Sequence, residues 1–300
     1  MISLSEYVLL NELYKYICLE YSINNLYNIN EVHGVFPNCR KISEDLTRVI
    51  REKLNKNIYQ FYFSILDCPE LFTNKIKIIL ALANGIKGAT GFSERDIRYK
   101  NKIKTLLQPD KIEIYLNSFD DYNEKSLEGM LAHELTHFFI FQIFYNKKID
   151  INEIIKKSGY EKYARNIKLT ADNIDDILYF SDKNEISAYI PQIDIFIKHG
   201  KFNDPKEAFE EIMKLPLCVL MIKIKDNVNK QKENKEYIIA CRNYIDECKN
   251  KSDEQIWKFL QERVNDSFEK FRRSIAKLCY DEFFKSENSD YVFKENLIIF

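Results

Sequence analysis

Glycine and proline are scarce in this sequence, with 7 and 6 copies among 300 residues. Turn-rich all-β folds need both residues at many turns, so their scarcity favours long helices over a β-sandwich. Long apolar runs are also missing, since stretches such as IILALA and LPLCVLMI fall far short of the roughly 20 residues that cross a bilayer. The amino-terminal stretch has no basic start and is interrupted by Glu6 and Glu12. It therefore does not predict a secretory signal, and we expect no membrane partner.

An excess of charge of one sign is missing too. The 45 lysines and arginines nearly balance the 46 acids, which leaves a formal net charge of −1. This excludes a broadly basic surface and predicts no nucleic-acid partner, although a local basic patch is still compatible with the composition. The 7 cysteines form an odd set with no CxxC pair, which indicates reduced thiols in a cytoplasmic protein. A metal role for Cys241 and Cys248 is much less favoured than burial. The oligomeric state stays open.

The first part of the chain shows helical spacing and then strand spacing. Residues 4–29 and the segment SEDLTRVIREKL, which begins at Ser43, are predicted as helices. Residues 57–66 and 75–82 are rich in β-branched and aromatic side chains and are predicted as strands. Clean alternation at 111–117 predicts a third strand, at an edge of the sheet.

Three of the few glycines, Gly85, Gly88 and Gly91, fall between the second and third predicted strands. Their clustering predicts a turn-rich loop. No GKS or GKT sequence ends this segment, so it does not match a phosphate-binding loop, and a nucleotide site is disfavoured.

Beyond residue 145 the pattern is almost entirely helical, and Pro191 and Pro216 are predicted as breaks or kinks. The closing YVFKENLIIF is either a short strand or a docked tail. The whole pattern predicts an α+β fold, predominantly α. The predicted helices after residue 145 are 151–165, 171–180, 183–198, 206–224, 231–249 and 253–285.

The stretch MLAHELTHFF, residues 130–139, contains the residues best suited to bind a metal and catalyse a reaction. It places His133 and His137 four positions apart in a predicted helix, where both imidazoles lie on one face and can bind a single zinc ion. Glu134 lies one step round the helix, where its carboxylate can take a proton from a water that the metal activates. The alternative is a pair of core histidines. The chain has only 4 histidines, and chance placement would give an HExxH match in on the order of a few per thousand such chains.

A catalytic zinc usually has three protein ligands, so a third must come from elsewhere. The sequence FFIFQIF after His137 excludes the HExxHxxGxxH pattern. Glu185, at the start of a later predicted helix, is the best candidate because it completes a His₂Glu set. Asp182, Asp194 and His199 are weaker candidates.

With these residues the chain resembles the gluzincin metallopeptidases, a group that includes thermolysin-like and anthrax-lethal-factor-like enzymes. HELTH matches their first motif, and NEISA at 184–188 looks like the second, which supplies the third ligand. The order of a strand, GATGF, the strand KIEIYL and the motif helix is similar to the zincin core. The resemblance implies that an edge strand pairs with an extended peptide substrate. It covers roughly residues 43–200, between a helical segment at 1–42 and a helical region at 201–300.

The chain departs from the family pattern in its second motif. Where gluzincins usually carry an acid that supports a zinc-binding histidine, this sequence has Tyr189, whose hydroxyl is a weaker supporting group for His133. Pro191 would shorten or kink the same helix. The resemblance also implies a tyrosine or histidine that stabilises the developing oxyanion, and Tyr179 is the first match to try, although packing is the default role of a tyrosine.

These residues together predict a zinc-dependent metallopeptidase acting on a protein or peptide. His133, His137 and Glu185 would bind Zn²⁺, Glu134 would be the general base, and Tyr179 would assist. One alternative is a non-catalytic helical interaction protein with a degenerate or structural metal site. Another is a dedicated toxin or effector protease with one intracellular target, which the sequence does not separate from a general peptidase.

Overall fold

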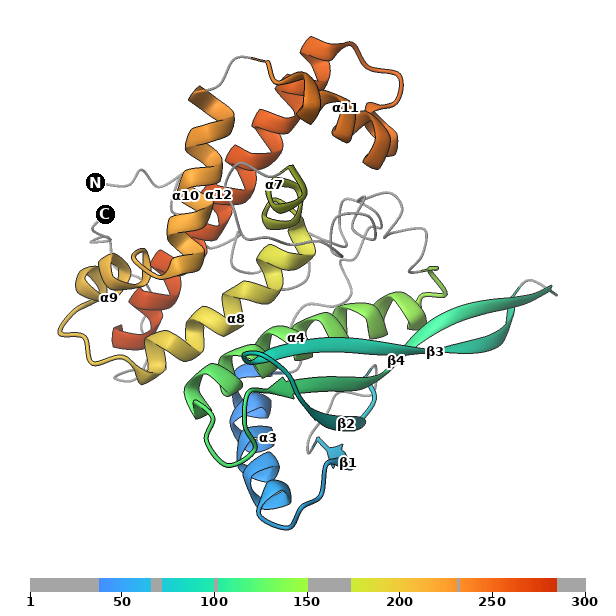
Figure 1. The fold of residues 1–300 in the computed structure, drawn as a ribbon, viewed down its shortest axis with the longest axis vertical. Coiled ribbons are helices and arrows are strands. Elements are labelled where there is room, and N and C mark those ends of the chain that lie inside the picture. Colours follow the sequence, from blue (N-terminus) through green and yellow to red (C-terminus); the bar gives the residue numbers. More distant parts are fainter. Residues whose placement is uncertain (1–37, 66–71, 100–101, 151–173, 231–232, 285–300) are drawn as a thin grey trace. The chain divides into compact units, whose positions relative to one another are not determined.

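The computed structural model describes residues 38–65, 72–99, 102–150, 174–230 and 233–284. Over these residues the protein has a four-stranded mixed sheet and is otherwise mostly helical (Figure 1). The predicted α+β class, predominantly α, is confirmed. None of the described helices is both long enough and apolar enough to cross a membrane. The predicted elements at 4–29, 151–165 and 291–300 lie outside the described residues.

The described residues divide into two compact units. The sheet unit comprises the described part of 23–153 together with 187–199. The helical unit comprises the described parts of 154–186 and 200–300. The predicted domain boundaries near residues 42 and 200 stay a prediction.

The sheet has the strand order β1–β2–β4–β3. β1 (Gln60–Ser64) pairs antiparallel with β2 (Lys75–Leu82), and β2 pairs parallel with β4 (Lys102–Leu116). β3 (Lys87–Tyr99) pairs antiparallel with β4. β3 and β4 thus form a long hairpin that extends beyond the end of β2 (Figure 1). All three predicted strands are present, and β2 has the predicted bounds.

Alternation of side chains buries one face of this sheet. Along β2 and along residues 111–116 of β4 every second residue is buried, and the residues between them are partly or fully exposed. Successive side chains of a strand point to opposite faces, so this pattern marks a sheet with one face in the core. Each such aliphatic side chain contributes about 1.5–3 kcal/mol on burial. The buried residues are Ile76, Ile78, Leu80, Ile112, Ile114 and Leu116.

The predicted position of the third strand is wrong. Residues 111–117 belong to β4, which is paired on both sides and therefore lies inside the sheet. Among the described strands, β3 lies at the edge of the sheet next to β4. Alternation indicates which face of a strand is buried, but it does not indicate whether the strand has one neighbour or two.

The predicted glycine-rich loop is also mostly wrong, because Gly88 and Gly91 lie within β3. Only Gly85, with φ +83°, lies in the turn that precedes the strand. Gly88 has a packing role, since a Cβ built on it would lie 2.3 Å from Cγ of Glu134. A glycine inside a strand often marks such a close approach rather than a turn.

Two helices pack in the sheet unit. α3 (Cys39–Leu54) packs on α4 (Glu124–Asn146), and α4 packs against β3 and β4. Asn123 caps α4, since its side chain accepts the backbone N–H of Ser126 at 3.0 Å. α4 is buried around almost its whole circumference from residue 127 to residue 144, so it is the inner helix of this unit.

α8 (Lys183–His199) begins in the helical unit and continues as part of the sheet unit from Ser187. Of the predicted break or kink at Pro191, the break is wrong, because the helix runs on to His199, and the kink stays a prediction. Tertiary contacts hold the part of the helix that follows Pro191. Asp194 accepts a hydrogen bond from Arg40 of α3 at 3.1 Å, and His199 lies 3.1 Å from Glu128 of α4.

The helical unit contains five further α-helices: α7 (Ile174–Phe180), α9 (Pro205–Ile212), α10 (Pro216–Lys230), α11 (Lys235–Tyr244) and α12 (Asp253–Phe284). α9, α10 and α11 all pack on α12. The predicted break at Pro216 is confirmed, since the segment predicted at 206–224 divides into α9, which ends at Ile212, and α10, which begins at Pro216. The helix predicted at 231–249 ends at Tyr244, and a short 3₁₀ turn follows at Asp246–Cys248.

Candidate metal centre

The two histidines of the HELTH motif face each other on α4. Their Nε2 atoms lie 3.0 Å apart, and their ring centroids are 4.7 Å apart with planes inclined by 76°. Both side chains are buried, with 8% of His133 and 6% of His137 exposed. The four-residue helical spacing therefore brings two imidazole nitrogens together in the interior, as the sequence predicted.

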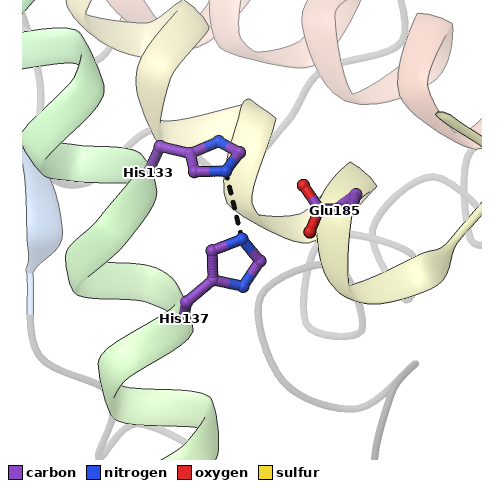
Figure 2. Close-up of side chains that lie close together, drawn as sticks. All are labelled: His133, His137 and Glu185. Atoms are coloured by element: carbon purple, nitrogen blue, oxygen red, sulfur yellow. Dashed lines mark hydrogen bonds between the residues drawn. The ribbon is translucent and has the colours of Figure 1, made fainter. Parts of the chain in front are cut away.

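Glu185 completes the group from the first turn of α8. The ligand atoms of His133, His137 and Glu185 all lie within 4.8 Å of one another, and all three residues are buried. Figure 2 shows the Glu185 carboxylate turned toward both imidazoles. The structure thus brings together the three residues that the sequence selected, in a buried group that could hold a metal ion.

The donor set fits a divalent transition metal. An ion that binds two imidazole nitrogens at about 2.0–2.1 Å with tetrahedral angles holds them about 3.3 Å apart. The observed separation of 3.0 Å is close to this value. In addition, Glu185 is 0% exposed, and an ionised carboxylate is costly to bury unless a positive charge compensates it. A cation between the three side chains would supply that charge.

The weaker candidates for the third ligand are engaged elsewhere. Asp182 lies 3.7 Å from Arg263, Asp194 bonds to Arg40, and His199 lies beside Glu128. The group that could hold a metal ion, found among the described residues, includes none of these three.

Glu134 contacts the edge strand β3. Its carboxylate accepts a hydrogen bond from Oγ1 of Thr90 at 3.1 Å, and its backbone carbonyl lies 3.2 Å from the same hydroxyl. The side chain is buried, and Gly88 leaves room for it against the strand. The residue next to the first histidine is therefore fixed between the motif helix and the edge of the sheet.

The two tyrosines of the sequence analysis lie in different settings. The ring of Tyr189 packs edge-on against the ring of His133, with centroids 4.6 Å apart. This ring contact orients His133, and hydroxyl support for the histidine stays a prediction. Tyr179 is on α7, where its ring contacts Phe180 at 5.1 Å. Its proposed role toward an oxyanion also stays a prediction.

Sequence reasoning missed the residues that support the group. Thr90 and Gly88 sit in GATGF, whose small residues suggested a loop rather than a strand packed on the motif helix. Asp182 was considered only as a ligand. Its side chain accepts the backbone N–H of Asn184 at 2.9 Å, which makes it the N-cap of α8. The spacing of Asp182 and Glu185, an acid cap followed three residues later by Glu, was the signal that could have identified it.

Burial raises the pKa of Asp182 above its ordinary value. The nearby charge of Glu185 acts in the same direction, and the guanidinium of Arg263 opposes both. The first turn of α8 therefore holds two buried acids three positions apart, with an arginine beside one of them.

Comparisons with models of known protein families, with curated proteins and with solved structures find no match to this chain.

Proposed function

We propose that this protein is a zinc-dependent peptidase. The observation that carries the proposal is the buried group of His133, His137 and Glu185, with Glu134 in the residue next to the first histidine. Two histidines and a glutamate are a known ligand set of catalytic zinc in peptidases. The resemblance of HELTH and NEISA to the gluzincin motifs supports the same conclusion.

His133, His137 and Glu185 would hold the ion. Zinc bound there supplies a Lewis acid, which makes a water acidic near neutral pH and polarises a peptide carbonyl. Glu134 accepts the proton of the attacking water at its carboxylate and then delivers it to the departing amine nitrogen. Thr90 keeps that carboxylate oriented. Tyr179 is the proposed donor to the oxyanion.

The edge strand β3 supports a peptide as the substrate class. Within the described sheet β3 pairs only with β4, so its other edge can add one more strand. An extended peptide bound there would run alongside Thr90, which contacts the proposed base. Backbone hydrogen bonds would give affinity, and alternate side chains would give selectivity.

The protein is further proposed to be cytoplasmic. Cys218, Cys241 and Cys248 are buried free thiols, which suits a reducing compartment.

Replacing Glu134 by glutamine tests the proposal. Glutamine preserves the shape of the side chain but cannot accept the proton, so the variant should keep its zinc and lose peptide cleavage by about 100-fold or more. The measurement is metal analysis of the purified protein together with digestion of an unbiased peptide library. An exposed acid of the same helix, Glu124, provides the control, because Glu124→Gln should cleave as the wild type does. Equal cleavage by wild type and Glu134→Gln would refute the proposal.

A structural metal site is the second candidate, and the near-complete burial of all three ligands favours it. A closed structural site contributes directly to folding. In that case zinc removal by a chelator would lower the melting temperature strongly, and neither wild type nor Glu134→Gln would cleave any peptide.

A further inference from the structure

Two side chains of α12, Arg263 and Ser267, donate hydrogen bonds to the junction between α7 and α8. Arg263 donates from Nε to Oγ of Ser181 at 3.0 Å and from Nη2 to the backbone carbonyl of Leu178 at 3.1 Å. The same Nη2 lies 3.7 Å from Oδ2 of Asp182. One turn further along α12, Ser267 donates its hydroxyl to the backbone carbonyl of Ser181 at 2.9 Å. Leu178, Ser181 and Asp182, which lie within five positions of one another, are thus tied to one helix.

Asp182 connects the junction to the first turn of α8, because it contacts Arg263 and also caps the helix. Its Oδ1 accepts the backbone N–H of Asn184 at 2.9 Å, and its side chain also accepts the backbone N–H of Glu185. Its own carbonyl accepts the N–H of Ile186 at 3.0 Å, the first hydrogen bond of the helix. The cap therefore determines where the backbone of Glu185 lies and in which direction its side chain leaves the helix.

Burial makes these contacts effective. The side chains of Arg263 and Asp182 are 16% and 6% exposed, so their charges are poorly screened by water. Removing one partner of such a pair leaves an uncompensated buried charge, which is strongly unfavourable. Without Arg263, Asp182 would either leave its position or repel the carboxylate of Glu185 in the same turn.

We propose that Arg263 is a positioning residue for the metal centre, acting through the Asp182 cap on Glu185. This inference rests on the proposed function to the extent that Glu185 is a metal ligand. It assigns a structural role to α12, although no sequence motif connects this helix to the HELTH segment. Groups that orient metal ligands typically change metal affinity by 10- to 100-fold when they are lost.

The test compares zinc affinity between arginine variants of α12. Arg263→Met removes both the paired N–H donors of the guanidinium group (its fork) and its charge. The variant should weaken zinc binding by about 10- to 100-fold in a chelator competition. Arg263→Lys keeps the charge but not the fork geometry, and it should recover part of the affinity. Arg272 is the matched control: it is on the same helix and pairs only locally with Glu269 at 3.3 Å among its described contacts. Arg272→Met should bind zinc as the wild type does.

A double-mutant cycle separates a positioning role from general destabilisation. If Arg263 acts through Glu185, then Arg263→Met should weaken zinc binding no further in a Glu185→Gln background, where a weaker amide ligand keeps the zinc affinity measurable. Additive losses would show that Arg263 acts by another route and would overturn the inference. The Co²⁺ absorption spectrum gives an independent readout, because a displaced carboxylate changes the ligand field, and an unchanged spectrum in Arg263→Met would count against the proposal.

The outcomes also separate this inference from the proposed function. If wild type binds zinc tightly and Arg263→Met binds it equally well, the inference alone fails. If wild type binds no zinc, both fail. Should Arg263→Met not fold, Ser267→Ala loosens the same junction more gently. That variant should lose zinc affinity by a few fold, and unchanged affinity would overturn the inference.

Discussion

The hydroxyl of Thr90 donates a hydrogen bond to the carboxylate of Glu134 at 3.1 Å, from the edge strand to the motif helix. The donor lies on a rigid strand, and the acceptor is the proposed general base. The strand that would receive a substrate and the residue that would move a proton are therefore in direct contact.

Replacing Thr90 by valine should lower kcat by about 10-fold and leave KM nearly unchanged. Valine has the shape of threonine but no hydroxyl, so the base loses its orientation while the strand stays intact. Thr90→Ser keeps the hydroxyl and should restore most of the activity. Steady-state kinetics of both variants, with zinc content measured alongside, is the appropriate measurement. A Thr90→Val enzyme with wild-type kcat would show that Glu134 is held by other contacts.

Gly88→Ala should push Glu134 out of position. A Cβ at this site would lie 2.3 Å from Cγ of Glu134 and 2.4 Å from Sδ of Met130, so the strand or the helix must shift. Overpacking of this kind typically costs about 1–3 kcal/mol. We expect a lower denaturant midpoint and a loss of cleavage. Ala89 is the exposed neighbour on the same strand, so Ala89→Ser serves as the control and should leave both quantities unchanged.

His137→Ala should abolish stoichiometric zinc binding, because only His133 and Glu185 of the three ligands would remain. His199→Ala provides the comparison. His199 lies beside Glu128 and outside the proposed metal centre, so its removal should leave the zinc content intact. Metal analysis after dialysis measures both. Retention of zinc by His137→Ala would mean that the ion binds elsewhere.

Cys218 and Cys241 should resist thiol reagents in the folded protein. Burial raises the pKa of each thiol to about 12, so almost no thiolate forms at pH 8, where an ordinary cysteine is substantially ionised. Mass-spectrometric mapping after brief alkylation should find both residues unmodified, and unfolding in guanidinium chloride should expose them. Rapid modification without denaturant would contradict the packing of the helical unit.

The local sequence pattern was sufficient to predict the motif helix and much of the sheet. α4 was evident because HELTH lies in a densely apolar segment, and β2 was found at its observed bounds because the segment is rich in β-branched side chains. Glu185 was found by chemical reasoning, since two imidazoles leave a catalytic zinc short of a ligand. In these cases the deciding information lies within a few residues or in the chemistry of the ion.

The incorrect and missing predictions have a different cause. β3 was mistaken for a loop because Gly88 and Gly91 serve close packing there, and the residues they pack against, Glu134 and Lys111, are distant in sequence. The interior position of β4 depends on strand order, which periodicity does not encode. A lone arginine such as Arg263, on a helix dense in charge, gives no spacing signal that connects it to Ser181. Pairings of this kind appear only when the chain is folded.

The parallel pairing of β2 with β4 constrains the route by which this protein folds. β4 follows β3 in the chain but lies between β3 and β2 in the sheet. The hairpin closes a short loop, whereas the contact of β4 with β2 closes a longer one and so carries a larger entropic cost. We therefore expect the hairpin to form early and to insert as one piece beside β2. A slow phase in the refolding of this protein would then reflect this insertion step.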